Sequence, residues 1–325
     1  MELEIKQVGA FMRKILIIVL TLATTLPLFA WKIQSVKKIT TEGEWTNPAF
    51  SPDGTKFFAL NGKRQICVFD ERGESLIIKT NTNIDLPCWS PDSKMLAAEV
   101  ESTLKPVAIL DVAEDLKARY IGEKAFKPCW SSDGKSIYAI YWKLDHGLAV
   151  SKLKELIVGG EGSNEFIEMP KDKNNIRCMT VSPKEATLAF SHNQGTGGTK
   201  LYSIDLDENE KKKIADGLKG DMVFWSPDGN FIWTGDELIV MEANTIVSEG
   251  MPHAPLAVWS KDSKWLFYSK EDGDLARFDI TVKKEEVLIT KDRFESNASF
   301  TQDGLSAVCL DGKDGNLLLI KLVNE

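Results

Sequence analysis

The stretch Trp225-Ser226-Pro227-Asp228-Gly229 decides the fold, because variants of it recur along the chain. Its last four residues fit a type I β-turn: Pro presets φ, Asp accepts hydrogen bonds from nearby backbone N–H groups, and Gly tolerates the left-handed conformation at the exit. An aromatic or apolar residue precedes the turn, and an apolar strand follows it. The stretch therefore predicts a tight turn between two β-strands.

Copies of this turn recur with the period of a propeller blade. From the Ser or Thr of one copy to that of the next, the spacings are 39, 41, 51, 44, 34 and 41 residues. A four-stranded propeller blade takes roughly 40–45 residues. The seven copies therefore predict an all-β, seven-bladed β-propeller with four-stranded blades. The copies begin at Phe50, Trp89, Trp130, Val181, Trp225, Trp259 and Phe300, and the fourth is degraded to Val-Ser-Pro-Lys-Glu.

Short apolar strands follow each turn, and no segment shows a sustained helical period. We expect second strands at 57–60, 95–100, 137–141, 187–190 and 265–268. Third strands are expected at 66–70, 107–111, 201–205, 238–242 and 275–279, and weaker fourth strands at 76–79 and 287–290. We interpret the recurring aspartates as turn residues rather than a ring of catalytic or metal-binding carboxylates, because the same turn chemistry explains every copy. The aromatic residue before each Ser is predicted to pack between blades.

The sequence also predicts how the ring closes. The last copy ends after a third strand at 317–322, whereas residues 39–50 align without gaps with residues 289–300 at an offset of 250. Residues 33–40 should therefore pair with the C-terminal blade as its outer strand, which removes an exposed sheet edge. We expect residues 31–325 to form a single propeller domain.

Residues 1–30 have the pattern of a secretory signal peptide. Arg13 and Lys14 precede an uncharged apolar stretch at 15–31, with Ala30 as the expected cleavage point and Met12 as a more usual start. An uncleaved membrane anchor is the alternative, but this stretch is interrupted by Pro27 and is short against the roughly 20 residues that span a bilayer. We therefore expect a periplasmic or otherwise exported protein of the cell envelope.

Composition narrows the function classes. The chain has 325 residues, with 40 Lys+Arg, 48 Asp+Glu and a net charge of −8, and it lacks the clustered basic face that nucleic acid requires. Its three histidines, His146, His192 and His253, leave little material for a histidine metal site or for acid–base steps near neutral pH. We therefore expect no catalysis, no metal, no cofactor and no nucleic-acid partner.

The five cysteines are scattered along the chain. Because their number is odd and each lies in an apolar, strand-like run, we expect buried free thiols rather than a disulfide framework. They are Cys67, Cys88, Cys129, Cys178 and Cys309.

The repeated W-S-P-D-G phrase resembles that of the TolB-like branch of β-propellers, which includes the non-catalytic domains of tricorn and prolyl oligopeptidase proteins. The resemblance covers about residues 33–325 and, like WD-type repeats, implies a protein-binding module. TolB itself carries an additional α/β domain and a six-bladed ring, so the resemblance is to the repeat family. The chain has no G-x-S-x-G nucleophile turn of the propeller-bearing peptidases.

On one face of the predicted ring, the side chains differ from blade to blade. In a propeller, the connections between blades and those between second and third strands share one face, and the S-P-D-G turns occupy the other. Mixed charge with aromatic residues suits a protein or peptide partner from the cell envelope. We expect a monomer that contacts the membrane only if the N-terminal segment is uncleaved. The candidate binding residues are Trp45, Asp85, Lys124, Phe126, Trp142, His146, Arg177, His192, Asp221, His253, Arg293 and Phe294.

Two other functions stay open. All three histidines fall on the predicted face, and the related seven-bladed oligogalacturonate lyases use histidines and a divalent metal near the axis. This resemblance implies a metal-assisted polysaccharide lyase as an alternative, with His146, His192 and His253 as the available imidazoles. The third hypothesis is a substrate-gating subunit of a separate peptidase.

Overall fold

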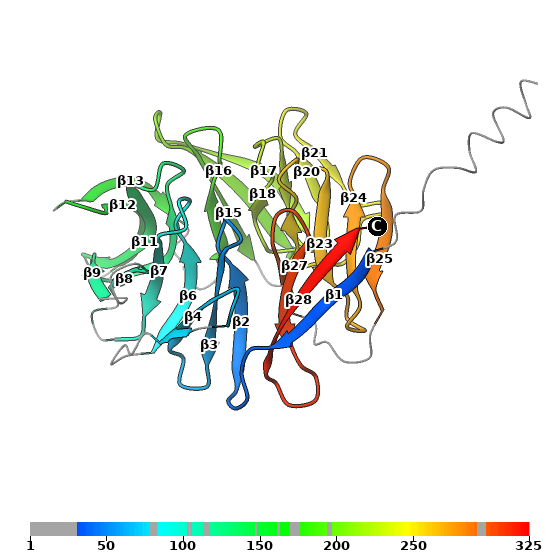
Figure 1. The fold of residues 1–325 in the computed structure, drawn as a ribbon. Helices are drawn as coiled ribbons and strands as arrows, with labels where there is room; N and C mark the ends of the chain where they lie inside the picture. The colour runs from blue at the N-terminus through cyan, green and yellow to red at the C-terminus, as the bar shows by residue number, and fades with distance from the viewer. Residues whose placement is uncertain are drawn as a thin grey trace, which may run out of the picture.

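A computed structural model describes residues 31–73, 75–77, 83–102, 104, 106–112, 118–146, 148–160, 163–169, 176–193, 197–290 and 297–324. The described residues form seven four-stranded antiparallel sheets and no α-helix. Figure 1 shows the sheets arranged around one ring, so the predicted all-β, seven-bladed propeller is confirmed. None of the described residues forms a helix with the length and apolar character needed to cross a bilayer.

The first six blades each use four consecutive strands, ordered from the innermost to the outermost. Blades 1 to 3 comprise β2 (Trp45–Phe50), β3 (Lys56–Asn61), β4 (Ile66–Asp70) and β5 (Ser75–Ile77); β6 (Ile84–Trp89), β7 (Met95–Val100), β8 (Val107–Asp111) and β9 (Ala118–Ile121); and β10 (Ala125–Trp130), β11 (Ser136–Asp145), β12 (Leu148–Ile157) and β13 (Ser163–Met169). Blades 4 to 6 comprise β14 (Ile176–Val181), β15 (Thr187–Asn193), β16 (Thr199–Asp205) and β17 (Glu210–Leu218); β18 (Phe224–Trp225), β19 (Phe231–Trp233), β20 (Leu238–Val240) and β21 (Thr245–Val247); and β22 (Val258–Trp259), β23 (Trp265–Ser269), β24 (Leu275–Asp279) and β25 (Lys284–Ile289).

The predicted strands occur in their predicted places, with differences at their ends. The strand expected at 238–242 ends at Val240, because Met241 begins a turn in which its carbonyl accepts a hydrogen bond from the N–H of Asn244. The strand expected at 137–141 is longer, because β11 and β12 continue their ladder out to the pair Asp145–Leu148. Of the strand expected at 76–79, the described part ends at Ile77.

Blade 7 is closed by the N-terminal strand, as the alignment predicted. Its inner three strands are β26 (Ser299–Phe300), β27 (Ser306–Leu310) and β28 (Leu317–Asn324), and β1 (Trp31–Lys38) is the outermost. The β1–β28 ladder runs from the pair Trp31–Asn324 to the pair Lys38–Leu318. In Figure 1 the two strands cross the outside of the ring side by side. An edge that would otherwise be free is thereby covered.

The repeated turns have the predicted chemistry. In the second copy, Ser90 Oγ donates to Asp92 Oδ1 (2.7 Å) and accepts the N–H of Met95, while Asp92 accepts the N–H of Lys94. The Ser90 hydroxyl is the main cause that lowers the pKa of Asp92. The same Ser–Asp or Thr–Asp bond recurs in the copies at 51–53, 131–133, 226–228, 260–262 and 301–303. These aspartates therefore act as turn residues.

The aromatic residue that precedes the repeated turn lies between blades, also as predicted. The indole N–H of Trp89 donates to the carbonyl of Ala49 in blade 1 at 3.1 Å, and that of Trp130 donates to the carbonyl of Cys88 in blade 2 at 3.2 Å. Trp259 donates in the same way to Phe224 of blade 5 at 3.0 Å. The apolar cores likewise lie between neighbouring sheets. An indole N–H thus ties each of blades 2, 3 and 6 to the blade before it.

The cysteines are free, as expected. Cys67, Cys129 and Cys309 are buried, and Cys88 and Cys178 are half-buried.

Candidate functional site

We call the loop face the side of the ring where innermost strands begin and second strands end, and the turn face the side with the Ser-Asp turns. Trp45, Asp85, Lys124, Phe126 and Arg177 lie at or beside the beginnings of β2, β6, β10 and β14, and so belong to the loop face. Asp221 and His253 precede β18 and β22 on the same face. Trp142, His146 and His192 lie at the far ends of second strands. Arg293 and Phe294 lie outside the described residues.

Charged residues of the loop face pair across neighbouring blades. Arg64, in the β3–β4 hairpin of blade 1, forms an ion pair with Asp85 at the beginning of blade 2. The same guanidinium contacts Glu101 Oε2 at 3.1 Å, and Asn83 donates to that oxygen at 3.0 Å. Bonding to Asp85 raises the pKa of Arg64. Asp85, one of the candidate binding residues, therefore forms an ion pair that joins blades 1 and 2.

A second pair joins blades 4 and 5. Arg177 Nε lies 3.8 Å from Asp221 Oδ2, and both side chains remain partly exposed. The backbone around them is tied as well, because Ser191 Oγ donates to the carbonyl of Asp221 and accepts the N–H of Cys178 at 3.1 Å. Two predicted binding residues thus contact each other across the junction.

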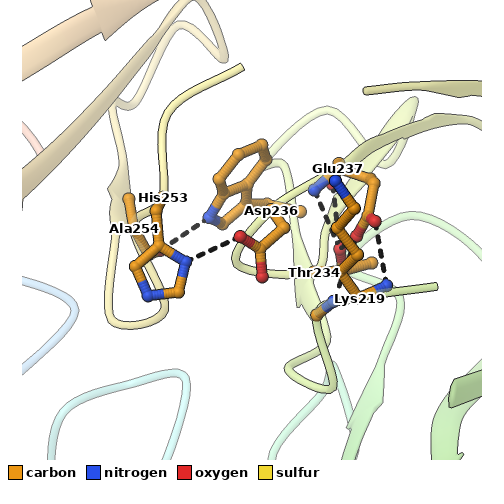
Figure 2. Close-up of polar contacts among 8 residues, drawn as sticks. Lys219, Thr234, Asp236, Glu237, His253 and Ala254 are labelled. Carbon is orange, nitrogen blue, oxygen red and sulfur yellow. Dashed lines mark hydrogen bonds and ion pairs between the residues drawn. The ribbon is translucent and has the colours of Figure 1, made fainter. Parts of the chain in front are cut away.

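The third pair contains a histidine. His253 Nδ1 lies 2.6 Å from Oδ1 of Asp236, which belongs to the β19–β20 hairpin of blade 5 (Figure 2). The imidazole is 57% exposed. The loop that carries it is held in place because Trp233 donates its indole N–H to the carbonyl of Ala254 at 2.8 Å. His253 is therefore oriented by a carboxylate at the edge of the ring.

Beside this pair, Glu237 is buried, and both of its carboxylate oxygens accept hydrogen bonds within the protein. Its carboxylate accepts the N–H of Lys219 at 2.9 Å, the N–H of Gly220 at 3.2 Å and the hydroxyl of Thr234 at 2.7 Å (Figure 2). A buried carboxylate is tolerated when donors surround it in this way. Glu237 thus fixes the connection between blades 4 and 5 and leaves no carboxylate oxygen for a reaction.

A polar hollow of about 480 Å³ adjoins His253 between blades 5 and 6. The Tyr268 hydroxyl donates to Glu285 Oε2, while Lys270 Nζ lies 3.3 Å from Oε1 of the same carboxylate. Burial, followed by the bond to Glu285, raises the pKa of Tyr268, and Glu285 raises that of Lys270. Glu271 and Asp272 also line the hollow, so carboxylates outnumber its one lysine.

The three histidines do not converge. His146 lies exposed in the β11–β12 turn of blade 3, with φ at 49°. His192 is a buried residue of β15 in blade 4, only 8% exposed, rather than a loop residue. His253 belongs to the connection between blades 5 and 6. Within the part of the chain that the structure describes, no three side chains among His, Cys, Asp and Glu are grouped closely enough to hold a metal ion. The described residues therefore do not fit a metal centre.

The remaining candidates differ in exposure. Lys124 is exposed and Phe126 is half-buried. Trp45 is half-buried, packs edge-on against Phe69 with ring centroids 5.6 Å apart, and donates its N–H to the carbonyl of Glu42. Sequence reasoning missed Arg64 and Asp236, because both lie in hairpins outside the repeated phrase. Each pairs with a residue that follows in the chain and lies at the beginning of the next blade or in the connection to it.

Comparison with known proteins gives a likeness at the level of fold. No protein-family model matches the chain, and neither does any curated protein. Among solved structures, an oligogalacturonate lyase in complex with manganese has a TM-score of 0.67 at 14% identity, covering 90% of this chain and 95% of the other. An oligogalacturonate lyase from Vibrio parahaemolyticus has a TM-score of 0.62 at 13% identity, covering 90% and 96%. These likenesses establish the propeller fold.

Proposed function

We propose that this protein is an exported, monomeric and non-catalytic binding module of the cell envelope, which holds a protein or peptide partner on its loop face. The observation that carries the proposal is the arrangement of the ionisable side chains. Asp85, Arg177, Asp221 and His253 take part in pairs that bridge neighbouring blades, and these pairs are spread around the ring. A catalytic site requires its acid, base and substrate-binding groups to face one space.

The same face offers the features of a protein-binding surface. It combines exposed charges of both signs with partly exposed aromatic residues such as Trp45 and Phe126. Aromatic residues and arginine carry most of the affinity in many protein interfaces, while charges at the rim steer association and specificity. Arg177 is well placed for this role because half of its side chain is accessible.

A lyase is the second candidate, favoured by the fold of the manganese-containing neighbour and by the ordered His253–Asp236 pair. The charge around His253 opposes it. Its hollow contains Glu271, Asp272 and Glu285 against Lys270, and an oligogalacturonate is a polyanion that such a lining repels. We therefore rank binding above this reaction.

Metal analysis of the purified protein distinguishes the two candidates. The binding proposal expects no stoichiometric divalent metal and no unsaturated uronate product from oligogalacturonate, with or without added manganese. Stoichiometric metal that is lost on His253→Ala, together with product formation, would establish the lyase instead.

Capture from an envelope extract tests the binding face. Charge reversal at Lys124 or Arg177 should remove a partner that the unaltered protein retains, because both side chains are accessible on the loop face. Arg72→Glu, on an exposed arginine of the turn face, is the matched control and should retain it. Equal capture by all variants would count against the loop face as the interface.

A further inference from the structure

A second candidate binding site lies on the propeller axis and opens at the turn face. The innermost strands of blades 2 to 6 enclose two adjoining hollows of about 500 Å³ and 470 Å³. Thr180, Val181, Pro183 and Phe224 line both, so we treat them as one axial hollow. The aromatic residues of the neighbouring repeats complete its wall: Trp89, Trp130, Trp225 and Trp259.

The degraded fourth repeat contributes a smaller side chain to the wall of this hollow. Every other copy of the turn has Trp or Phe at the position that Val181 occupies in blade 4. A Val side chain is much smaller than an indole or phenyl ring, and packed interiors contain few voids larger than a water molecule. Val181 lines both hollows, so a ring at this position would reduce the space between them.

The lining suits an uncharged ligand. Among the described residues that line the axial hollow there is no Lys, Arg, His, Asp or Glu. Its ionisable groups are thiols, and burial raises the pKa of Cys88 to about 12 and that of Cys178 to about 11, which keeps both neutral at pH 7. Since a charged group loses its hydration on entering such a space without a partner, a neutral molecule is favoured.

One donor at the hollow lacks an acceptor. The indole N–H groups of Trp89, Trp130 and Trp259 bond to the preceding blade, but Nε1 of Trp225 is enclosed without a hydrogen-bond partner among the described residues. A buried unpaired donor carries a cost that an incoming acceptor relieves. The ring of Trp225 is half-buried and lines the hollow, so this donor lies beside the space that a ligand would occupy.

We propose that the axial hollow binds a compact, neutral and mainly apolar molecule that carries a carbonyl-type hydrogen-bond acceptor for Trp225. A peptide segment fits less well, because it would bury several backbone N–H and C=O groups among largely apolar side chains. The site lies on the face opposite the proposed partner surface and does not depend on it.

The neutral dye Nile red, which has a carbonyl acceptor, is a suitable probe for the full protein. We expect saturable binding of one dye per chain, with increased dye emission and quenching of tryptophan fluorescence. Val181→Phe restores the ring found in other repeats and should weaken binding at least tenfold. Trp225→Phe keeps an aromatic ring, although a smaller one, and removes the N–H; it should weaken binding by about three- to tenfold, the size of one hydrogen bond.

Two control variants and a stability measurement make the test decisive. Trp265→Phe makes the same substitution in β23 of blade 6, outside the lining of the axial hollow, and should leave dye affinity unchanged within about twofold. Tyr120→Ser alters a separate apolar hollow, formed by blade 2 and its connection to blade 3, and should also leave the dye affinity unchanged. Thermal unfolding identifies any variant that fails to fold. If Val181→Phe fails to fold, the comparison of Trp225→Phe with Trp265→Phe decides.

Three results would overturn the proposal: no saturable dye binding, full affinity in a folded Val181→Phe variant, or equal effects of Trp225→Phe and Trp265→Phe. Displacement of the dye by an uncharged peptide of mixed sequence, but not by small ketones or esters, would assign the hollow to a peptide instead.

Discussion

The hydroxyl of Thr40 donates a hydrogen bond to Oδ1 of Asn316 at 3.0 Å, although the two residues are 276 positions apart. Both are buried, and Thr40 Oγ1 also accepts the N–H of Leu317 at 2.9 Å. Next to them, Lys38 bonds to Asp314 and lowers its pKa to about 2. The two ends of the ring are therefore joined by side chains as well as by the β1–β28 ladder.

Thr40→Val should destabilise the fold by about 2 kcal/mol or more, because it leaves a buried N–H and a buried amide without partners. The free energy of unfolding in urea, followed by tryptophan fluorescence, measures this. Thr245→Val is the control, since Thr245 is exposed and bonds only within its own turn; it should change stability by less than about 0.5 kcal/mol. Equal losses in the two variants would contradict a special role for the Thr40 contact.

Gly220→Ala should destabilise the protein by about 3 kcal/mol or more, because a Cβ at this position would lie 2.2 Å from the carbonyl oxygen of Thr234. That oxygen is backbone, so the junction beside Glu237 must shift. Gly159→Ala is matched to it, as a Cβ there has no neighbour within 4 Å. Urea unfolding of the two variants should differ clearly, and similar stabilities would show that the junction is looser than described.

The Ser90–Asp92 turn should make a pH-dependent contribution to the free energy of unfolding. The pKa of Asp92 is lowered in the folded state, so its stabilisation is complete above the unfolded value of about 3.9 and is lost as pH falls through the folded value. Because the carboxylate is half-exposed, we expect Asp92→Ala to cost only about 1 kcal/mol at pH 7. The gap from wild type should narrow below about pH 4.

Unfolding titrations at several pH values check this expectation. Asp207→Ala, in an exposed turn, serves as the control and should track the wild type throughout. A gap between Asp92→Ala and wild type that widens on acidification would contradict the assignment of the carboxylate to the turn.

The thiols should be unreactive in the native protein. Burial raises the pKa of Cys67 to about 11 and that of Cys309 to about 12, and it raises the pKa of Cys129 as well. Since the thiolate is the reactive form, little iodoacetamide should add at pH 8, whereas unfolded protein should take up five labels. Mass spectrometry counts the labels, and rapid labelling of native Cys67 would contradict its burial.

The repeated phrase was sufficient to predict the blade number, most strands and the closing strand. A Ser-Pro-Asp-Gly turn acts locally, and its spacing reports directly on the strands around it. Even the degraded copy at Val181 could be aligned, because Ser182 still accepts backbone N–H groups from Lys184 and Glu185.

The contacts between blades could not be predicted in the same way. Arg64 and Asp236 lie in hairpins of variable length, and their partners belong to the next blade, so the pairing depends on the angle between adjacent sheets. His192 shows the same limit, since its position at a strand end did not reveal that the side chain is buried. The axial hollow arises from a difference between repeats, which becomes a space only when the ring is assembled.

The position of β1 has a consequence for the engineering of this chain. Trp31 and Asn324 face each other in the β1–β28 ladder, so a short linker joining them would make the ring continuous without stretching the backbone. New termini could then be opened in the exposed β16–β17 turn near Asp207, where blade 4 would be completed by both ends of the permuted chain. Circular permutation would thus transfer the closure from blade 7 to blade 4 and show whether the Thr40–Asn316 contact is needed once the ends are covalently joined.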